Sequence, residues 1–131
     1  FTCVSMGNPH AVCFVDDWDA LADELFVDPS DKRLATFDVG RVGAFFEAHE
    51  LFPEKANVEF ATVGPRGLAM RVHERGCGET LACGTGACAV QVAASLTERA
   101  GCENDVELRG GVLHIGDDAA PEFRAKVRLP L

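Results

Sequence analysis

The segment 84–99 constrains the fold more than any other part of this sequence. Its spacing predicts a helix that ends before Gly101. The apolar residues of this helix are small and lie on nearly every side of it: Ala87, Cys88, Ala89, Val90, Val92, Ala93, Ala94 and Leu96. A helix with this pattern is buried on most sides rather than lying on a surface. The rest of the chain must therefore supply a shell around it.

Most other apolar segments have the spacing of β-strands, and a turn at Gly7-Asn8-Pro9 interrupts the first of them. Extended structure is predicted over 1–15, 58–63, 68–73, 106–109, 111–115 and 123–129. A second helix is predicted over 38–51, where Pro53 ends it. This mixed order of strands and helices indicates an α+β fold in which the strands wrap around the buried helix.

Length and charge limit the functions that the chain can have. A length of 131 residues predicts a single domain over 1–131. Twelve Lys and Arg residues stand against 21 Asp and Glu residues, which gives a net charge of −9. Nucleic acids and anionic membranes bind basic surfaces, so neither is an expected partner. No apolar run approaches the roughly 18 residues of a membrane span.

Six cysteines in a short chain can form a disulfide framework. However, Cys3, Cys13 and Cys88 lie in apolar runs, where a free cysteine behaves as a small hydrophobic residue. We therefore expect free thiols and a cytoplasmic protein, because the cytoplasm keeps thiols reduced.

The strongest chemical signal is Ala82-Cys83-Gly84-Thr85-Gly86-Ala87, at the start of the predicted buried helix. The partial positive charge and unpaired amides of a helix N-terminus stabilise a thiolate. The glycines let the backbone approach a ligand closely, so its N–H groups can hold a carboxylate. Cys83 is thus placed as a reactive thiol beside an anion site. The alternative is a cysteine that caps the helix and only packs.

Three other positions are weaker candidates. Glu74-Arg75 could bind the ammonium and carboxylate of a zwitterion, but both reach one ligand only if the strand kinks there. Taken alone, Glu74-Arg75 is better interpreted as an exposed ion pair. His10 follows Asn8-Pro9 at a turn, where an imidazole can act as a base or orient one. Asn57 precedes a strand and has the alternative role of a turn residue.

Metal and nucleotide sites are not indicated. Cys83 and Cys88 lie about 140° apart around a helix, so they face different ways. The sequence has no C-x-x-C pair, no H-E-x-x-H motif, and no phosphate-binding or dinucleotide fingerprint. The other histidines, His49, His73 and His114, are expected to be surface or partly buried residues.

Together, these motifs closely resemble one family, diaminopimelate epimerase, a cofactor-independent amino-acid epimerase. The resemblance rests on three segments in the same order: Val4-Ser5-Met6-Gly7-Asn8-Pro9-His10-Ala11-Val12, Asn57-Val58-Glu59-Phe60, and Met70-Arg71-Val72-His73-Glu74-Arg75-Gly76-Cys77-Gly78-Glu79-Thr80-Leu81-Ala82-Cys83-Gly84-Thr85-Gly86-Ala87. It implies two similar halves, each a barrel-like mixed or antiparallel sheet around a central helix, with the active site between them. Each half supplies one cysteine, and the two act as acid and base without pyridoxal phosphate.

The resemblance also implies a role for each matching residue. Cys83 is one of the two catalytic cysteines, and the amides of Gly84 and Thr85 hold the α-carboxylate of the substrate. Asn8, Asn57 and Arg75 recognise the distal end of diaminopimelate, and Glu74 meets an amino group. His10 and Glu74 adjust the protonation of the thiols. The resemblance implies no metal and no cofactor, and a role in lysine and cell-wall precursor synthesis.

One part of the family pattern is absent from this sequence. The first half, with its own Cys-Gly-Asn-Gly turn, is not present, and Cys77 has no implied role. We therefore expect the chain to be the C-terminal half of the enzyme, whose partner is the missing N-terminal half. The alternatives are a homodimer that uses two copies of Cys83, a non-catalytic module that binds a carboxylate or amino acid, and a related cysteine-dependent racemase.

Overall fold

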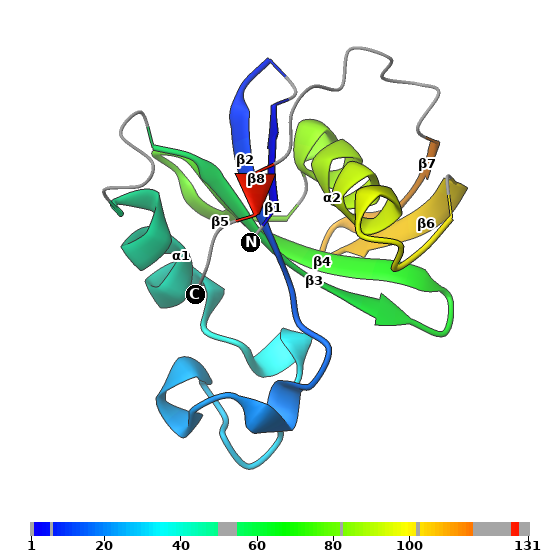
Figure 1. Ribbon diagram of the computed structural model, residues 1–131. Helices are drawn as coiled ribbons and strands as arrows, with labels where there is room; N and C mark the ends of the chain where they lie inside the picture. The colour runs from blue at the N-terminus through cyan, green and yellow to red at the C-terminus, as the bar shows by residue number, and fades with distance from the viewer. Residues whose placement is uncertain are drawn as a thin grey trace.

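The computed structural model describes residues 2–5, 7–49, 55–81, 83–101, 103–116 and 127–128, which form the predicted α+β fold (Figure 1). Eight described strands form one mixed sheet. Their bounds are Thr2–Ser5 (β1), Pro9–Phe14 (β2), Asn57–Gly64 (β3), Gly67–Glu74 (β4), Gly78–Thr80 (β5), Glu103–Leu108 (β6), Gly111–Gly116 (β7) and Val127–Arg128 (β8).

The order of strands in the sheet is β7-β6-β4-β3-β2-β1-β8, and β5 pairs with the end of β4. Strands β2 and β3 are parallel, as are β4 and β6, and the remaining pairs are antiparallel. The described helices are Val39–Glu47 (α1) and Gly84–Leu96 (α2). Within the described residues, neither helix is long and apolar enough to cross a bilayer.

The alternation of side chains along β3 and β4 divides the interior into two cores. Leu68, Met70 and Val72 of β4 pack against α2, whereas Val58 and Phe60 of β3 join the core beneath α1. Figure 1 shows α1 and α2 on either side of these strands. The two faces of the sheet are therefore both covered by a helix.

Helix α2 is buried along most of its length, as its composition predicts. Its buried residues are Gly86, Ala87, Ala89, Val90, Gln91, Val92, Ala93 and Ala94. The helix contacts β1, β2, β3, β4, β6 and β7. Small side chains let this many strands approach one helix, because each strand can lie close to the helix backbone.

The helices end earlier than the sequence predicts. Helix α2 ends at Leu96 rather than residue 99, because Glu98 adopts a positive φ of 60° and the Arg99 N–H bonds back to the Ala94 carbonyl at 2.8 Å. The reversal therefore occurs before Gly101. Helix α1 ends at Glu47, and the predicted stop at Pro53 lies outside the described residues. Of the strand predicted over 123–129, only 127–128 is described.

The segment 16–37, for which no element is predicted, forms three short 3₁₀ turns: Trp18–Ala20, Asp23–Leu25 and Leu34–Thr36. Its aromatic rings hold it against the sheet. Trp18, Phe26 and Phe37 pack edge to face, and Phe37 lies 4.8 Å from Phe60 of β3 between ring centroids. This aromatic cluster extends the core beneath α1.

Candidate active site

Cys83 occupies the N-cap of α2, as the sequence predicts. Its backbone is extended (φ −146°, ψ 109°), and its half-buried Sγ accepts a hydrogen bond from the Gly86 N–H at 3.3 Å. The Thr85 hydroxyl lies 3.6 Å from the same sulfur. The thiol therefore lies at the positive end of a 13-residue helix. Both roles predicted for Cys83, a reactive thiol and a helix cap that only packs, are compatible with this position.

Gly84 and Thr85 form the exposed first turn of α2 beside this thiol. The first N–H groups of a helix have no acceptor within the helix. Here the Gly86 N–H bonds to the Cys83 sulfur, and the Ala87 N–H bonds to the Cys83 carbonyl at 2.9 Å. The amides of Gly84 and Thr85 precede them at the helix end, where a carboxylate is favoured.

His10 is buried on β2, and both of its ring nitrogens have partners. Nδ1 lies against Oε1 of Glu59, and Nε2 lies 3.1 Å from Oδ1 of Asn8. Burial lowers the pKa of His10 to about 4, with Glu74 opposing the change and Arg75 adding to it. The imidazole is therefore neutral at neutral pH.

Glu59 is the residue of this site that the sequence analysis did not select. Its side chain is 0% exposed, and its Oε2 has no hydrogen-bond partner among the described residues. Burial raises the pKa of Glu59 well above its usual value; its own main-chain N–H opposes this, and Glu74 adds to it. The available signal is one acidic residue inside the apolar run Val58-Glu59-Phe60-Ala61, because glutamate is rarely buried without a partner.

Gly86 lies between Glu59 and Cys83. A Cβ atom at this position would lie 3.1 Å from Oε1 of Glu59 and 3.2 Å from Sγ of Cys83. A residue without a side chain lets the first turn of α2 approach both groups. The thiol and the buried carboxyl group are therefore neighbours across this glycine.

Strand register places these groups on the face of the sheet that α2 covers. His10 pairs with Asn57 and Val12 pairs with Glu59 across β2 and β3. Val12 belongs to the core around α2, so its neighbour Glu59 and the alternate residue Asn57 face the same side. Glu74 lies two residues beyond the core residue Val72 on β4 and shares that face as well.

The side chain of Asn57 binds the main chain at two places. Its Oδ1 accepts the Arg75 N–H at 2.6 Å, and its Nδ2 donates to the Pro9 carbonyl at 3.4 Å. Asn57 thus connects the start of β2 to the residue after β4. The turn role that the sequence also allowed and the predicted substrate contact are both compatible with this position.

Strand β4 ends at Glu74, whose Oε2 accepts a hydrogen bond from the Thr80 hydroxyl. The chain then turns through Gly76, which has a φ of 78°, and Arg75 lies exposed in this turn. Adjacent residues of a straight strand point to opposite faces, so Glu74 and Arg75 can reach one ligand only if the chain changes direction there, as it does here. Glu74 is also close enough to His10 and Glu59 to influence the pKa of both.

The remaining described cysteines are free thiols outside this cluster. Burial raises the pKa of Cys3, Cys13 and Cys88, with Cys83 adding to the effect on Cys88. These three therefore remain protonated thiols, in keeping with their predicted packing role. Cys77 is exposed in the turn after β4. In the described part of the chain, no three His, Cys, Asp or Glu residues gather as a metal site would require.

The expectation for His73 is wrong. It is buried, and its side chain packs so closely against Gly43 of α1 that a Cβ atom at that position would clash with it. His49 is half-buried, and His114 is exposed with its Nδ1 2.9 Å from Asp105. All three lie outside the cluster around Cys83.

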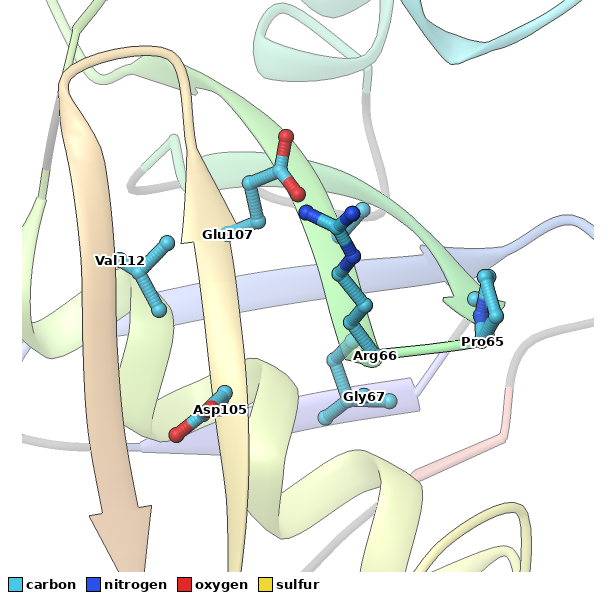
Figure 2. Close-up of a pocket in the computed structure, with 9 residues that line it drawn as sticks. Pro65, Arg66, Gly67, Asp105, Glu107 and Val112 are labelled. Carbon is cyan, nitrogen blue, oxygen red and sulfur yellow. The ribbon is translucent and has the colours of Figure 1, made fainter.

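A separate pocket of about 450 Å³ lies at the hairpin between β3 and β4. Figure 2 shows Arg66 and Glu107 directed toward each other in this pocket, with Asp105 and Val112 along its side. Strand β3 runs from Asn57 in the cluster around Cys83 to Gly64 at this hairpin. The pocket is therefore at the opposite end of β3 from Cys83.

A solved structure shares the fold of this chain. It is the crystal structure of the Bacillus anthracis phenazine biosynthesis protein of the PhzF family, with a TM-score of 0.51 and 19% sequence identity. The match covers 88% of this chain and 35% of that protein. At this identity the likeness concerns the fold alone.

Curated relatives named diaminopimelate epimerase are much more similar in sequence. The protein from Desulfovibrio desulfuricans is 51% identical over 120 residues, which are 91% of this chain and 36% of that protein. The protein from Synechococcus sp. (strain JA-3-3Ab) is 53% identical over 87% of this chain and 36% of its own length. That from Methanococcus maripaludis is 46% identical over 88% of this chain and 36% of its own length.

The chain therefore spans about a third of the length of the curated relatives that it matches. The family model for diaminopimelate epimerase matches residues 2–122, which include Cys83, the buried Glu59–His10 pair and all the other predicted site residues. With this match and about 50% identity to its relatives, the chain belongs to the diaminopimelate epimerase family.

Proposed function

We propose that this chain is the C-terminal half of a diaminopimelate epimerase and supplies one of its two catalytic cysteines. The observation that carries the proposal is the position of Cys83 at the N-terminus of α2, across Gly86 from the buried Glu59–His10 pair, in a chain of this family. The contacts of α2 with strands of the whole sheet support a barrel-like half, and a partner half would complete the site.

In the proposed reaction the Cys83 thiolate and the thiol of the partner half act on opposite faces of the α-carbon. One sulfur takes the α-proton, so the C–H bond breaks, an S–H bond forms and a carbanion remains. The other thiol gives its proton to the opposite face of the carbanion and becomes a thiolate. Configuration inverts, L,L- and meso-diaminopimelate interconvert, and no redox step or cofactor is required.

The first turn of α2 supports this chemistry in two ways. The amides of Gly84 and Thr85 are placed to hold the α-carboxylate and the negative charge that develops beside it. The positive helix end favours the thiolate form of a cysteine at the N-cap. Both effects act at the same place, so a substrate held by the amides has its α-carbon near the sulfur.

The remaining candidates take the roles that the family resemblance implies. Asn8, Asn57 and Arg75 recognise the distal end of the substrate, and Glu74 meets an amino group and adjusts the thiols together with His10. Such an enzyme acts in the cytoplasm on a small molecule, in lysine and peptidoglycan precursor synthesis. The anion site at α2 and the turn that follows Glu74 support this assignment.

The test is proton NMR of L,L-diaminopimelate in heavy water under reducing conditions, which follows loss of the α-proton signal. We expect exchange when the chain is combined with the N-terminal half. Cys83→Ser should abolish it, because a hydroxyl is far less acidic than a thiol, while the free energy of unfolding stays within about 1 kcal/mol since serine is a good N-cap. The control is Cys77→Ser, in an exposed turn, which should exchange normally.

Other outcomes would replace the proposal. Substantial exchange by Cys83→Ser removes this cysteine from catalysis. Binding of diaminopimelate without any exchange, even with the other half present, indicates a non-catalytic binding module. Preference for proline, which has no distal ammonium or carboxylate, indicates a related racemase. Exchange by the chain alone, with a dimer in light scattering, indicates a homodimer that uses two copies of Cys83.

A further inference from the structure

Glu59, His10 and Asn8 form a hydrogen-bond chain that does more than hold the strands together. Glu59 and His10 are 0% and 1% exposed, and they come from neighbouring strands of the sheet. Asn8, at the open end of this chain, is half-buried and precedes β2. We propose that Glu59 is a positioning residue. Its carboxyl group donates a hydrogen bond to His10 Nδ1, and this bond decides whether the oxygen or the NH₂ group of the Asn8 amide meets the substrate.

The surroundings of Glu59 favour its protonated form. An ionised carboxylate in a dry interior requires several hydrogen bonds or a charged partner. The partners of the Glu59 carboxyl group are His10, at Oε1, and its own main-chain N–H, and its Oε2 has no hydrogen-bond partner within the described residues. A lone buried oxygen is tolerated far better as the carbonyl of a neutral acid than as part of an anion. The nearby Glu74 carboxylate also favours the neutral form, so Glu59 carries a proton.

The protonation of Glu59 sets the tautomer of His10. Burial keeps the ring neutral, and of the charged groups around it Glu74 favours the cation while Arg75 opposes it. If Glu59 donates to Nδ1, the single ring proton must be on Nε2. Nε2–H then donates to Oδ1 of Asn8, 3.1 Å away. The two bonds are consistent with each other because each nitrogen of a neutral imidazole has only one role.

The tautomer of His10 in turn sets the orientation of the Asn8 amide. With its oxygen accepting from His10, Asn8 presents its NH₂ group to a ligand, and NH₂ suits a carboxylate. If His10 were the Nδ1–H tautomer instead, Nε2 would accept, the amide would rotate, and its oxygen would suit an ammonium. Glu59 therefore determines that Asn8 recognises a carboxylate. The recognition of a carboxylate by Asn8 rests on the proposed function, since it takes diaminopimelate as the ligand. The protonation of Glu59 and the tautomer of His10 are independent of the proposed function.

The direct test is NMR of the intact protein with ¹⁵N in its histidine rings and ¹³C in its glutamate side chains, at pH 7. The His10 signals are those that disappear in His10→Gln. We expect a single proton on His10 Nε2 and a protonated Glu59 carboxyl carbon. The internal control is Glu79, which accepts two hydrogen bonds from Arg71 at 2.6 and 2.7 Å and must be ionised in the same sample. An ionised Glu59, a proton on His10 Nδ1, or an imidazolium overturns the proposal.

Kinetics of the assembled enzyme test the consequence for the substrate. Glu59→Gln keeps an N–H donor for Nδ1, whereas Glu59→Met has a similar length and no donor. We expect the KM for diaminopimelate to stay within about threefold in Glu59→Gln and to rise about tenfold in Glu59→Met, with a smaller change in kcat. Equal KM values in the two variants would refute the donor role.

These results are separable from the proposed function. If the wild-type enzyme exchanges no α-proton, the function fails, while the NMR result still decides the hydrogen-bond chain. A merely structural role for Glu59 would lower the stability of both variants without separating their KM values. Glu79→Gln is the matched control, because it makes the same substitution on β5, away from His10 and Asn8, and should leave KM unchanged.

Discussion

Gly86→Ala is the substitution that most directly probes the arrangement of the candidate site. The new methyl group would lie 3.1 Å from Oε1 of Glu59, 3.2 Å from Sγ of Cys83 and 3.3 Å from its Cβ. Ordinary contacts are near 3.5–4.0 Å, so both groups would have to move by a few tenths of an ångström. Alanine in a helix gains about 1 kcal/mol over glycine, and overpacking costs about 1–3 kcal/mol. The free energy of unfolding should therefore fall by about 0–2 kcal/mol.

The effect of Gly86→Ala on catalysis should be much larger than its effect on stability. A misplacement near 1 Å can lower a rate by about 100-fold, so a loss of at least tenfold in α-proton exchange is expected from moving the thiol. Gly40→Ala is the control: it lies in α1, nothing is within 4 Å of its would-be Cβ, and it should stabilise the fold with exchange unchanged. If Gly86→Ala stabilises the protein as Gly40→Ala does and exchanges normally, the close approach of α2 to Glu59 is refuted.

Three further predictions concern binding, pH and stability. Arg75→Ala should raise the KM for diaminopimelate by tenfold or more with little change in kcat, as steady-state kinetics would show. Because the pKa of Glu59 is raised well above its usual 4.5, the folded protein holds a proton that the unfolded chain releases, and the free energy of unfolding should fall as the pH rises. Below pH 6.5 the lowered pKa of His10 has the opposite effect on the free energy of unfolding. Urea titrations from pH 6.5 to 8 should show a fall of up to about 1.4 kcal/mol per pH unit that is absent in Glu59→Gln. Arg71→Met, which breaks a largely buried ion pair with Glu79 and two bonds of 2.8 Å to main-chain carbonyls, should cost about 3 kcal/mol in thermal unfolding, against less than about 1 kcal/mol for Arg33→Met in an exposed pair.

Local features of the sequence were sufficient to predict strands β1 to β4 and the start of α2, but not the short strand β5, for which a loop was expected. The alternation of Leu68, Met70 and Val72 predicted the buried face of β4, and all three pack in the core around α2. The turn at Gly7-Asn8-Pro9 separates β1 from β2 as predicted. The helix ends were less accurate, because the residue that reverses the chain after α2 is Glu98 rather than the glycine that usually adopts a positive φ there.

The sequence alone determined the start of α2 and the position of Cys83. Capping signals, glycines and small apolar residues act within a few positions of one another, so their pattern is visible along the chain. The family resemblance extended this to His10, Asn57, Glu74 and Arg75, which it predicts to be members of one site.

Only the tertiary structure showed that Glu59 belongs with them. His10 and Glu59 are 49 positions apart, and they meet because β2 and β3 pair in a parallel register beneath the first turn of α2. The burial that raises the pKa of Glu59 and lowers that of His10 comes from the helix and sheet packed around them, not from their neighbours in sequence. Protonation depends on desolvation and on distance in space, which only the folded chain defines.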